Sequence, residues 1–278
     1  MQSRTTLETF LVQNELRHIT PLKVLGLFGS QLRSVPLRVV DESAYLLWSR
    51  RDASQYDSAK YPTAEVVFYP ALVEAPTPAM LNVCARAILH EARGRTFVVK
   101  TIETRLLDAL RVAAPAARFS YERALCTFTV AGDAPVQLPA AVSTHASHQI
   151  RTTTTITDEA QPLLDAHNVY STSELQTMFA DGNGRCIVSF DGDRAVAVAL
   201  SFPNSPSLYE IGSLYVSPAA RRAGHASALV RAALADLAAR DLAVRYVVDA
   251  TNAPSIVLAE RCGLREVMRL EHWLVAGA

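Results

Sequence analysis

The sequence lacks the features that would place it in a specialised class of protein. Its four cysteines lie far apart, without the close spacing of a zinc site or a redox motif. No apolar run approaches the roughly 20 residues needed to cross a bilayer, and charges interrupt the apolar positions of the first residues, unlike in a signal peptide. We therefore expect a soluble cytoplasmic protein with buried free thiols, no metal site and no membrane contact.

Charge of one sign is also lacking. The sequence has 27 lysines and arginines against 27 aspartates and glutamates. A neutral balance does not favour nucleic-acid binding, which normally needs a basic stripe, so we expect no nucleic-acid partner. Only three of the basic residues are lysines, a bias that indicates a GC-rich bacterial genome.

The composition that is present predicts a well-packed protein of about two domains. Hydrophobic residues make up 50% of the 278 residues, enough for a sizeable core, and domains average roughly 150 residues. Residues 131–147 are rich in Ala, Pro and Ser without periodicity, and we interpret them as a linker. The predicted domains are 1–130 and 148–278.

Both predicted domains show the same order of elements: strand, helix, strand, short helix, strand. This order predicts an α/β fold with a mixed sheet and a degenerate repeat of the second domain in the first. The alternative is that any α/β chain alternates in this way. Other patterns predict a helix at 6–17, a hairpin at 191–193 and a long helix at about 224–240.

One segment, 214–234, combines features of an anion-binding site. An apolar strand ends at Val216, a short polar turn follows, and an amphipathic helix begins near Gly224. The first N–H groups of a helix have no intrahelical partners and attract anions. Gly224 and Ala226 are small enough for a phosphate to approach, and Arg221 and Arg222 add positive charge. The alternative is an ordinary strand–turn–helix connection.

The spacing of this segment resembles the GNAT superfamily of N-acetyltransferases. Val216-x-Pro218-x-x-Arg221-x-x-Gly224-x-Ala226 is similar to the superfamily's signature for the diphosphate of acetyl-coenzyme A. NAPSIVLAERCGL, at 252–264, is similar to the second block of the superfamily. The sequences of both segments resemble the glycine N-acyltransferase branch most closely. The resemblance covers 148–275 and implies a GNAT fold there, with a degenerate GNAT-like half before it.

The resemblance also implies the contacts of an acetyl-coenzyme A co-substrate. Leu214, Tyr215 and Val216 are expected to present backbone groups to the pantetheine arm. Asn252 and Ser255 are expected near the pantetheine, and Asn252 is alternatively a helix cap. The diphosphate is expected to lie among the residues of the turn and the helix start: Arg221, Arg222, Ala223, Gly224, His225 and Ala226. The first domain lacks such a turn and carries Glu74 there, so we expect it to bind no coenzyme.

Two side chains are candidates for proton transfer. Glu210 resembles the glutamate base of some GNAT enzymes in its spacing from Val216, and we expect burial to raise its pKa. The alternative is a solvent-exposed carboxylate at a strand end. Many relatives carry a tyrosine acid where this chain has Ala259. Transfer could proceed without an acid, because the coenzyme thiolate is a tolerable leaving group. Alternatively Tyr246, the candidate we name, could replace it, as could Tyr215, Cys262 or a water. Cys262 is otherwise a buried thiol.

These features together predict an acetyl-coenzyme A-dependent N-acyltransferase. We expect direct transfer of an acetyl or short acyl group to a primary amine of a small molecule or amino acid, by a monomer or homodimer. The alternatives are acetylation of a protein N-terminus or lysine, and a non-catalytic module that binds acyl-coenzyme A.

Overall fold

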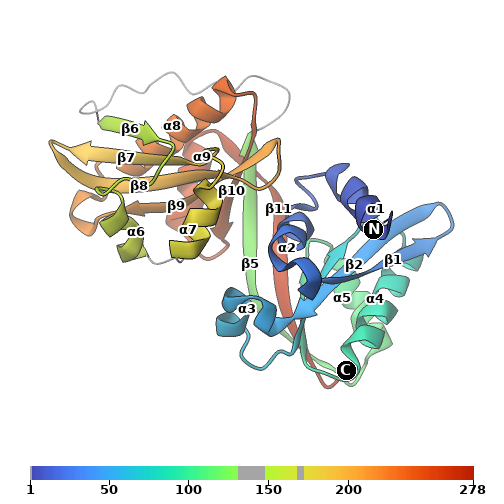
Figure 1. Ribbon diagram of the computed structural model, residues 1–278. Helices are drawn as coiled ribbons and strands as arrows, with labels where there is room; N and C mark the ends of the chain where they lie inside the picture. Colours follow the sequence, from blue (N-terminus) through green and yellow to red (C-terminus); the bar gives the residue numbers. More distant parts are fainter. Residues whose placement is uncertain (1, 131–147, 168–171) are drawn as a thin grey trace. The chain divides into compact units, whose positions relative to one another are not determined.

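The computed structural model describes residues 2–130, 148–167 and 172–278, so the expected linker at 131–147 lies outside the described residues. The chain forms two compact units (Figure 1). Unit 1 consists of 1–125 and 268–278, and unit 2 of 126–267. The predicted second domain, 148–278, instead includes the C-terminal strand. The structure groups it with unit 1 because its residues Glu271–Val275 pair with a strand of that unit.

Unit 1 contains a mixed sheet in the order β1-β2-β3-β4-β11. Strands β1 and β2, β2 and β3, and β4 and β11 are antiparallel, whereas β3 and β4 are parallel. The elements of this unit are α1 (Gln2–Val12), α2 (Ile19–Phe28), β1 (Arg33–Val39), β2 (Glu42–Arg50), α3 (Gln55–Lys60), β3 (Val66–Ala71), α4 (Pro78–Ala92), β4 (Phe97–Thr101) and α5 (Arg105–Ala113), with 3-10 turns at Gly29–Gln31 and Arg51–Ala53.

Unit 2 contains the strand order β10-β9-β8-β7-β6, in which only β9 and β10 are parallel among these pairs. Its elements are β6 (Gln149–Thr153), α6 (Gln161–His167), α7 (Thr172–Phe179), β7 (Arg185–Asp191), β8 (Arg194–Pro203), β9 (Leu208–Val216), a 3-10 turn at Pro218–Ala220, α8 (His225–Ala239), β10 (Ala243–Asp249) and α9 (Ala253–Arg261). The strands β5 (Arg118–Val130) and β11 (Leu264–Ala276) have residues in both units.

The same order of elements occurs in the two units. In unit 1, α4 connects the parallel strands β3 and β4; in unit 2, α8 connects the parallel strands β9 and β10. An antiparallel pair precedes the first of these strands in each unit. The predicted mixed α/β fold with a repeated element order is therefore confirmed.

In each unit, helices cover both faces of the strands. In unit 1, α4 and α5 contribute the apolar residues on one face, and α1 and α2 those on the other. In unit 2, residues of α8 and α9 pack on one face, and α6 and α7 on the other. Such two-faced burial explains why β3, β4 and β8 read as nearly continuous apolar runs.

The N-terminal helix prediction was partly wrong. Instead of one helix at 6–17, the chain forms α1 up to Val12 and a second helix, α2, from Ile19. The apolar pattern of α2 is nearly continuous rather than periodic, and the helix includes Pro21 in its first turn, where proline is tolerated.

Three observations on the described part of the chain concern membranes, metals and thiols. No helix there is long and apolar enough to cross a membrane. The described residues contain no group of three or more His, Cys, Asp or Glu side chains placed to hold a metal ion. All four cysteines are free and buried.

Candidate active site

The parallel strands β9 and β10 separate in the middle of unit 2. Their register runs from Leu208 opposite Ala243 to Ile211 opposite Tyr246, while β9 continues to Val216. On the other side of β9, the pairing with β8 shifts between Gly212 and Tyr215. Ser213, within this shift, has a positive φ of 48°. The pairing of β9 with β10 thus ends at Ile211, whereas Tyr215 and Val216 still pair with β8 beyond the irregularity.

The turn after β9 leads to a helix start without a side-chain cap. Gly224 occupies the N-cap of α8 with φ 94° and, having no side chain, makes no side-chain cap hydrogen bond. The first α-helical bond recorded to the cap runs from Ala228 N–H to the Gly224 carbonyl. The N–H groups of the first turn of α8, His225 and Ala226 among them, have no acceptor within the helix, and a helix start of this kind can bind an anion.

The two arginines of the turn are exposed, and they differ in conformation. Arg222 has a positive φ of 65°, which brings the chain around to Gly224. Arg221 is extended, and its Nε donates to the carbonyl of Val216 over 3.3 Å. Ala223 lies between them and Gly224 and is exposed. One of the two guanidinium groups is thus folded back onto the end of β9.

His225 points away from solvent. Its side chain is only 4% exposed, and its Nδ1 lies 2.9 Å from Ser189 Oγ on β7. The ring of His148 lies 4.2 Å from the His225 ring, and His148 Nε2 is 3.2 Å from where a Cβ on Gly224 would lie. Burial, followed by His148, lowers the pKa of His225. The imidazole of His225 thus faces β7, while its backbone N–H belongs to the first turn of α8.

Glu210 is buried, as expected, but it has a partner that the sequence analysis missed. Arg245 lies directly opposite on β10, and its Nη1 is 2.6 Å from Glu210 Oε2. Asn204 Nδ2 donates to the same oxygen over 2.8 Å. A guanidinium group at this distance favours the ionised form of a carboxylate, whereas burial disfavours it, so the two act on Glu210 in opposite directions. The solvent-exposed alternative is wrong, since Glu210 is 6% exposed.

The other oxygen of Glu210 lies towards the separation of the strands. Oε1 is 3.7 Å from the position that a Cβ on Gly212 would take. Gly212 stands where the pairing of β9 with β10 has ended, on the same face of the strand as Glu210. A side chain at this position would compete with any group approaching Glu210 from the separation.

Tyr246 contacts the start of α9. Its hydroxyl lies 2.7 Å from Ser255 Oγ, and its ring belongs to the same apolar cluster as Ala259 and Cys262. Burial raises the pKa of Tyr246 above its usual value. Burial also raises the pKa of the Cys262 thiol, which is 1% exposed and fits the structural interpretation of that residue.

The remaining predicted residues lie at the start of α9 and at the end of β9. Asn252 caps α9, since its Oδ1 accepts from Ser255 N–H over 3.3 Å, as its alternative interpretation required. On β9, Leu214 is partly buried against the α8 face, and Tyr215 against the α6 face, where it meets the His167 ring at 5.6 Å. Their side chains thus alternate across the strand and leave its backbone to make edge contacts.

The corresponding helix start in unit 1 is closed. Thr77 Oγ1 accepts from Met80 N–H over 3.2 Å, and Pro78 occupies the first turn of α4. Glu42 accepts from the Thr77 hydroxyl over 2.6 Å and from its N–H over 3.3 Å. A carboxylate thus already lies at this helix end, an arrangement that favours the prediction that unit 1 binds no coenzyme.

Unit 1 instead contains a buried polar cluster. Lys100 Nζ lies 2.6 Å from Asp57 Oδ1, and Tyr69 donates to the other carboxylate oxygen over 2.9 Å. Lys100 also lies over the rings of three tyrosines, at 5.2 to 5.8 Å. His272 contacts the Tyr61 hydroxyl through Nδ1, while its buried Nε2 has no partner among the described residues. This cluster was not predicted from the sequence.

Comparison with known proteins agrees with this geometry. The model of the acetyltransferase (GNAT) family matches residues 152–264. No curated protein matches the chain. A GNAT-family acetyltransferase from Colwellia psychrerythraea is similar in structure, with a TM-score of 0.58, 11% identity and coverage of 96% of each chain.

Two further solved structures extend the likeness over both units. A tandem GNAT protein from the clavulanic acid biosynthesis pathway has a TM-score of 0.52 at 14% identity, covering 92% of this chain and 87% of its own. A Drosophila protein has a TM-score of 0.59 at 14% identity, covering 98% and 94%. Residues 152–264 therefore match the acetyltransferase (GNAT) family, and the chain has a GNAT fold in a two-unit arrangement like that of a tandem GNAT protein.

Proposed function

We propose that this chain is an acyl-coenzyme A-dependent N-acyltransferase that transfers an acetyl or short acyl group to a primary amine. The observation that carries the proposal is the separation of β9 from β10 directly before an uncapped helix start. An extended ligand can pair with the open edge of β9, and its anionic end then meets the first amides of α8. Acetyl-coenzyme A combines these two properties and supplies the thioester that is cleaved.

Different residues of the site would contact different parts of this ligand. Backbone groups of Leu214, Tyr215 and Val216 would bind the pantetheine arm and polarise the thioester carbonyl. The diphosphate would lie against the turn, with Arg222 beside it and the amides of Gly224 to Ala226 beneath it. Ser255 and Asn252, at the start of α9, would border the arm near the sulfur.

Transfer requires a neutral amine and a protonated leaving group. Glu210, paired with Arg245 and hydrogen-bonded by Asn204, would accept a proton from the substrate ammonium directly or through a water, and the neutral amine so formed then attacks. The amine nitrogen forms a bond to the carbonyl carbon, and the bond from that carbon to sulfur breaks. Tyr246, paired with Ser255, would return a proton to the thiolate.

For the acceptor, we propose a small-molecule amine or an amino acid. The support is the resemblance of the two sequence blocks to the glycine N-acyltransferase branch, together with a neutral overall charge that favours no polymeric acceptor. A protein N-terminus or a lysine side chain is the second candidate, and a panel of amines and short peptides separates the two.

The experiment is thiol release from acetyl-coenzyme A in the presence of that panel. We expect release that depends on one class of amine and is lost in Glu210→Gln with unchanged coenzyme affinity. Tight coenzyme binding without release on any amine would favour the alternative of a non-catalytic binding module, for which the buried Glu210–Arg245 ion pair would be purely structural.

A further inference from the structure

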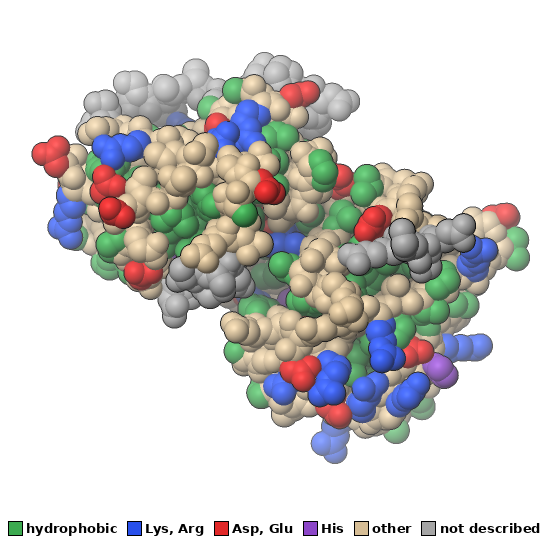
Figure 2. Space-filling model, in the orientation of Figure 1, with side chains coloured by type: hydrophobic (Ala, Val, Ile, Leu, Met, Phe, Trp, Pro, Cys, Tyr) green, Lys and Arg blue, Asp and Glu red, His purple; other side chains and the backbone are tan. Residues whose placement is uncertain are grey.

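Unit 1 contains an arginine-lined pocket that has no part in the proposed coenzyme site. The cavity has a volume of about 430 Å³, within the range of small-molecule sites. It lies where β3 begins, since Val66 lines it, whereas the turn that corresponds to the coenzyme turn of unit 2 follows the other end of β3. Basic side chains gather on the lower part of unit 1 in the view of Figure 2.

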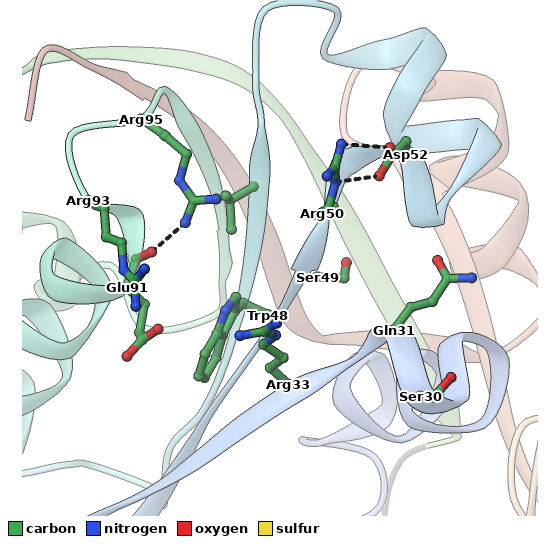
Figure 3. A pocket seen from close by; sticks show the side chains of 11 residues that line it. Ser30, Gln31, Arg33, Trp48, Ser49, Arg50, Asp52, Glu91, Arg93 and Arg95 are labelled. Atoms are coloured by element: carbon green, nitrogen blue, oxygen red, sulfur yellow. Dashed lines mark hydrogen bonds and ion pairs between the residues drawn. The ribbon is translucent and has the colours of Figure 1, made fainter.

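The fold brings the arginines together from two directions. Arg33 on β1 lies directly opposite Trp48 on β2, and Arg50, two residues further along β2, shares their face of the sheet. Arg93 and Arg95 follow the end of α4, which packs on the same face. Figure 3 shows Trp48 between the two groups, with Glu91 and Arg93 on one side and Arg33 on the other.

Two of these arginines are held by partners. Arg50 makes a bidentate interaction with Asp52, in which its Nε and Nη2 donate to the two carboxylate oxygens over 3.2 and 3.1 Å. Arg95 donates to the last carbonyls of α4, at 2.8 and 2.7 Å, and so offsets the negative end of that helix. Both guanidinium groups are thereby held at the pocket wall (Figure 3).

The other two arginines of the lining have charges that no partner in the described part of the chain offsets. Within the described residues, the guanidinium groups of Arg33 and Arg93 have no hydrogen-bond or ion-pair partner, although both line the pocket. Four arginines against Asp52 and Glu91 give the lining a net formal charge of +2. Clustering like charges is unfavourable unless an anion offsets them.

We propose that this pocket binds a small organic anion with two negative charges, a phosphate monoester or a dicarboxylate. Guanidinium groups bind both through paired N–H donors, so the recognition chemistry is the same. Arg33 and Arg93 supply the charge that the ligand neutralises, and Trp48 forms the wall between them.

The test is calorimetric titration of the full chain with ribose 5-phosphate and with succinate, using ribose as the uncharged control. We expect at least one of the two anions to bind, ribose not to bind, and the affinity to fall as salt is raised, because the charges are exposed. The two anions distinguish a phosphate site from a carboxylate site.

Variants separate this pocket from the coenzyme site. The double variant Arg33→Gln/Arg93→Gln should weaken binding at least tenfold. Arg86→Gln, which removes an exposed arginine of α4 outside the pocket, should leave it unchanged. Ala226→Glu, at the start of α8 in unit 2, should also leave it unchanged. Absence of binding by both anions at millimolar concentration, equal affinity in the double variant, or loss in Ala226→Glu would each overturn the proposal.

Discussion

The Glu210–Arg245 pair allows a stability role to be separated from a catalytic one. The two charges are 2.6 Å apart, with side chains 8% and 6% exposed. At an effective dielectric constant of about 20, their attraction is roughly 6 kcal/mol, but burying each ion costs several kcal/mol, so the net contribution of the pair is small. Removing only Arg245 takes away the cation 2.6 Å from the buried Glu210 carboxylate, and we expect Arg245→Met to lower the free energy of unfolding by about 3–5 kcal/mol.

The double variant Glu210→Gln/Arg245→Met then decides the role of the carboxylate. Because the double variant has neither charge of the pair, we expect it to recover much of the free energy of unfolding lost in Arg245→Met, as measured by urea unfolding. If Glu210 is the base, the double variant should still lose about 10²–10⁴-fold in kcat, with unchanged affinity for acetyl-coenzyme A. Recovery of activity along with stability would refute the catalytic role and leave a purely structural ion pair.

Three further predictions concern other groups. Tyr246→Phe should lower kcat for acetyl transfer by tenfold or more, and Ser255→Ala by less, with little change in coenzyme affinity. If steady-state assays give both variants the kcat of the unaltered chain, Tyr246 is excluded as the acid. In unit 1, Lys100→Met should destabilise the protein by about 3–5 kcal/mol by leaving Asp57 unpaired, and Lys100→Met/Asp57→Asn by less; a reversed order in urea unfolding would contradict this. Burial, together with Lys100, holds the pKa of His272 well below its usual value. The unfolded chain therefore binds the extra proton, and the free energy of unfolding falls as pH drops below about 6.5. His272→Gln should make the free energy of unfolding less dependent on pH between 7.5 and 5.5, and an unchanged dependence would argue against this role of His272.

Much of the fold was predictable because the local signals were strong. The turn at 191–193 closes the hairpin of β7 and β8 through Gly192, which has a positive φ of 58°. The helix predicted from Gly224 begins one residue later, at His225, because glycine serves as its N-cap. The exchange of the last strand into unit 1 was not predictable, since local pattern carries no information about which distant strand becomes a neighbour.

The site was predictable in its backbone and less so in its side chains. The motif spacing located the separated strand and the open helix start. It did not reveal Arg245 opposite Glu210, because the register between β9 and β10 depends on the packing of α8. A charged residue in each of two apolar strands was the available signal. Likewise, the inward rotation of His225 onto Ser189 depends on a partner 36 residues away.

The central claim is that acetyl-coenzyme A binds along β9 with its diphosphate at the start of α8, and calorimetric titration tests it most directly. We predict one binding event for the unaltered chain. Ala226→Glu, which places a carboxylate at the helix start, should weaken binding at least tenfold, while Ala235→Glu, an exposed position later in α8, should not change it. Absence of binding, or equal affinity in Ala226→Glu, would contradict the account.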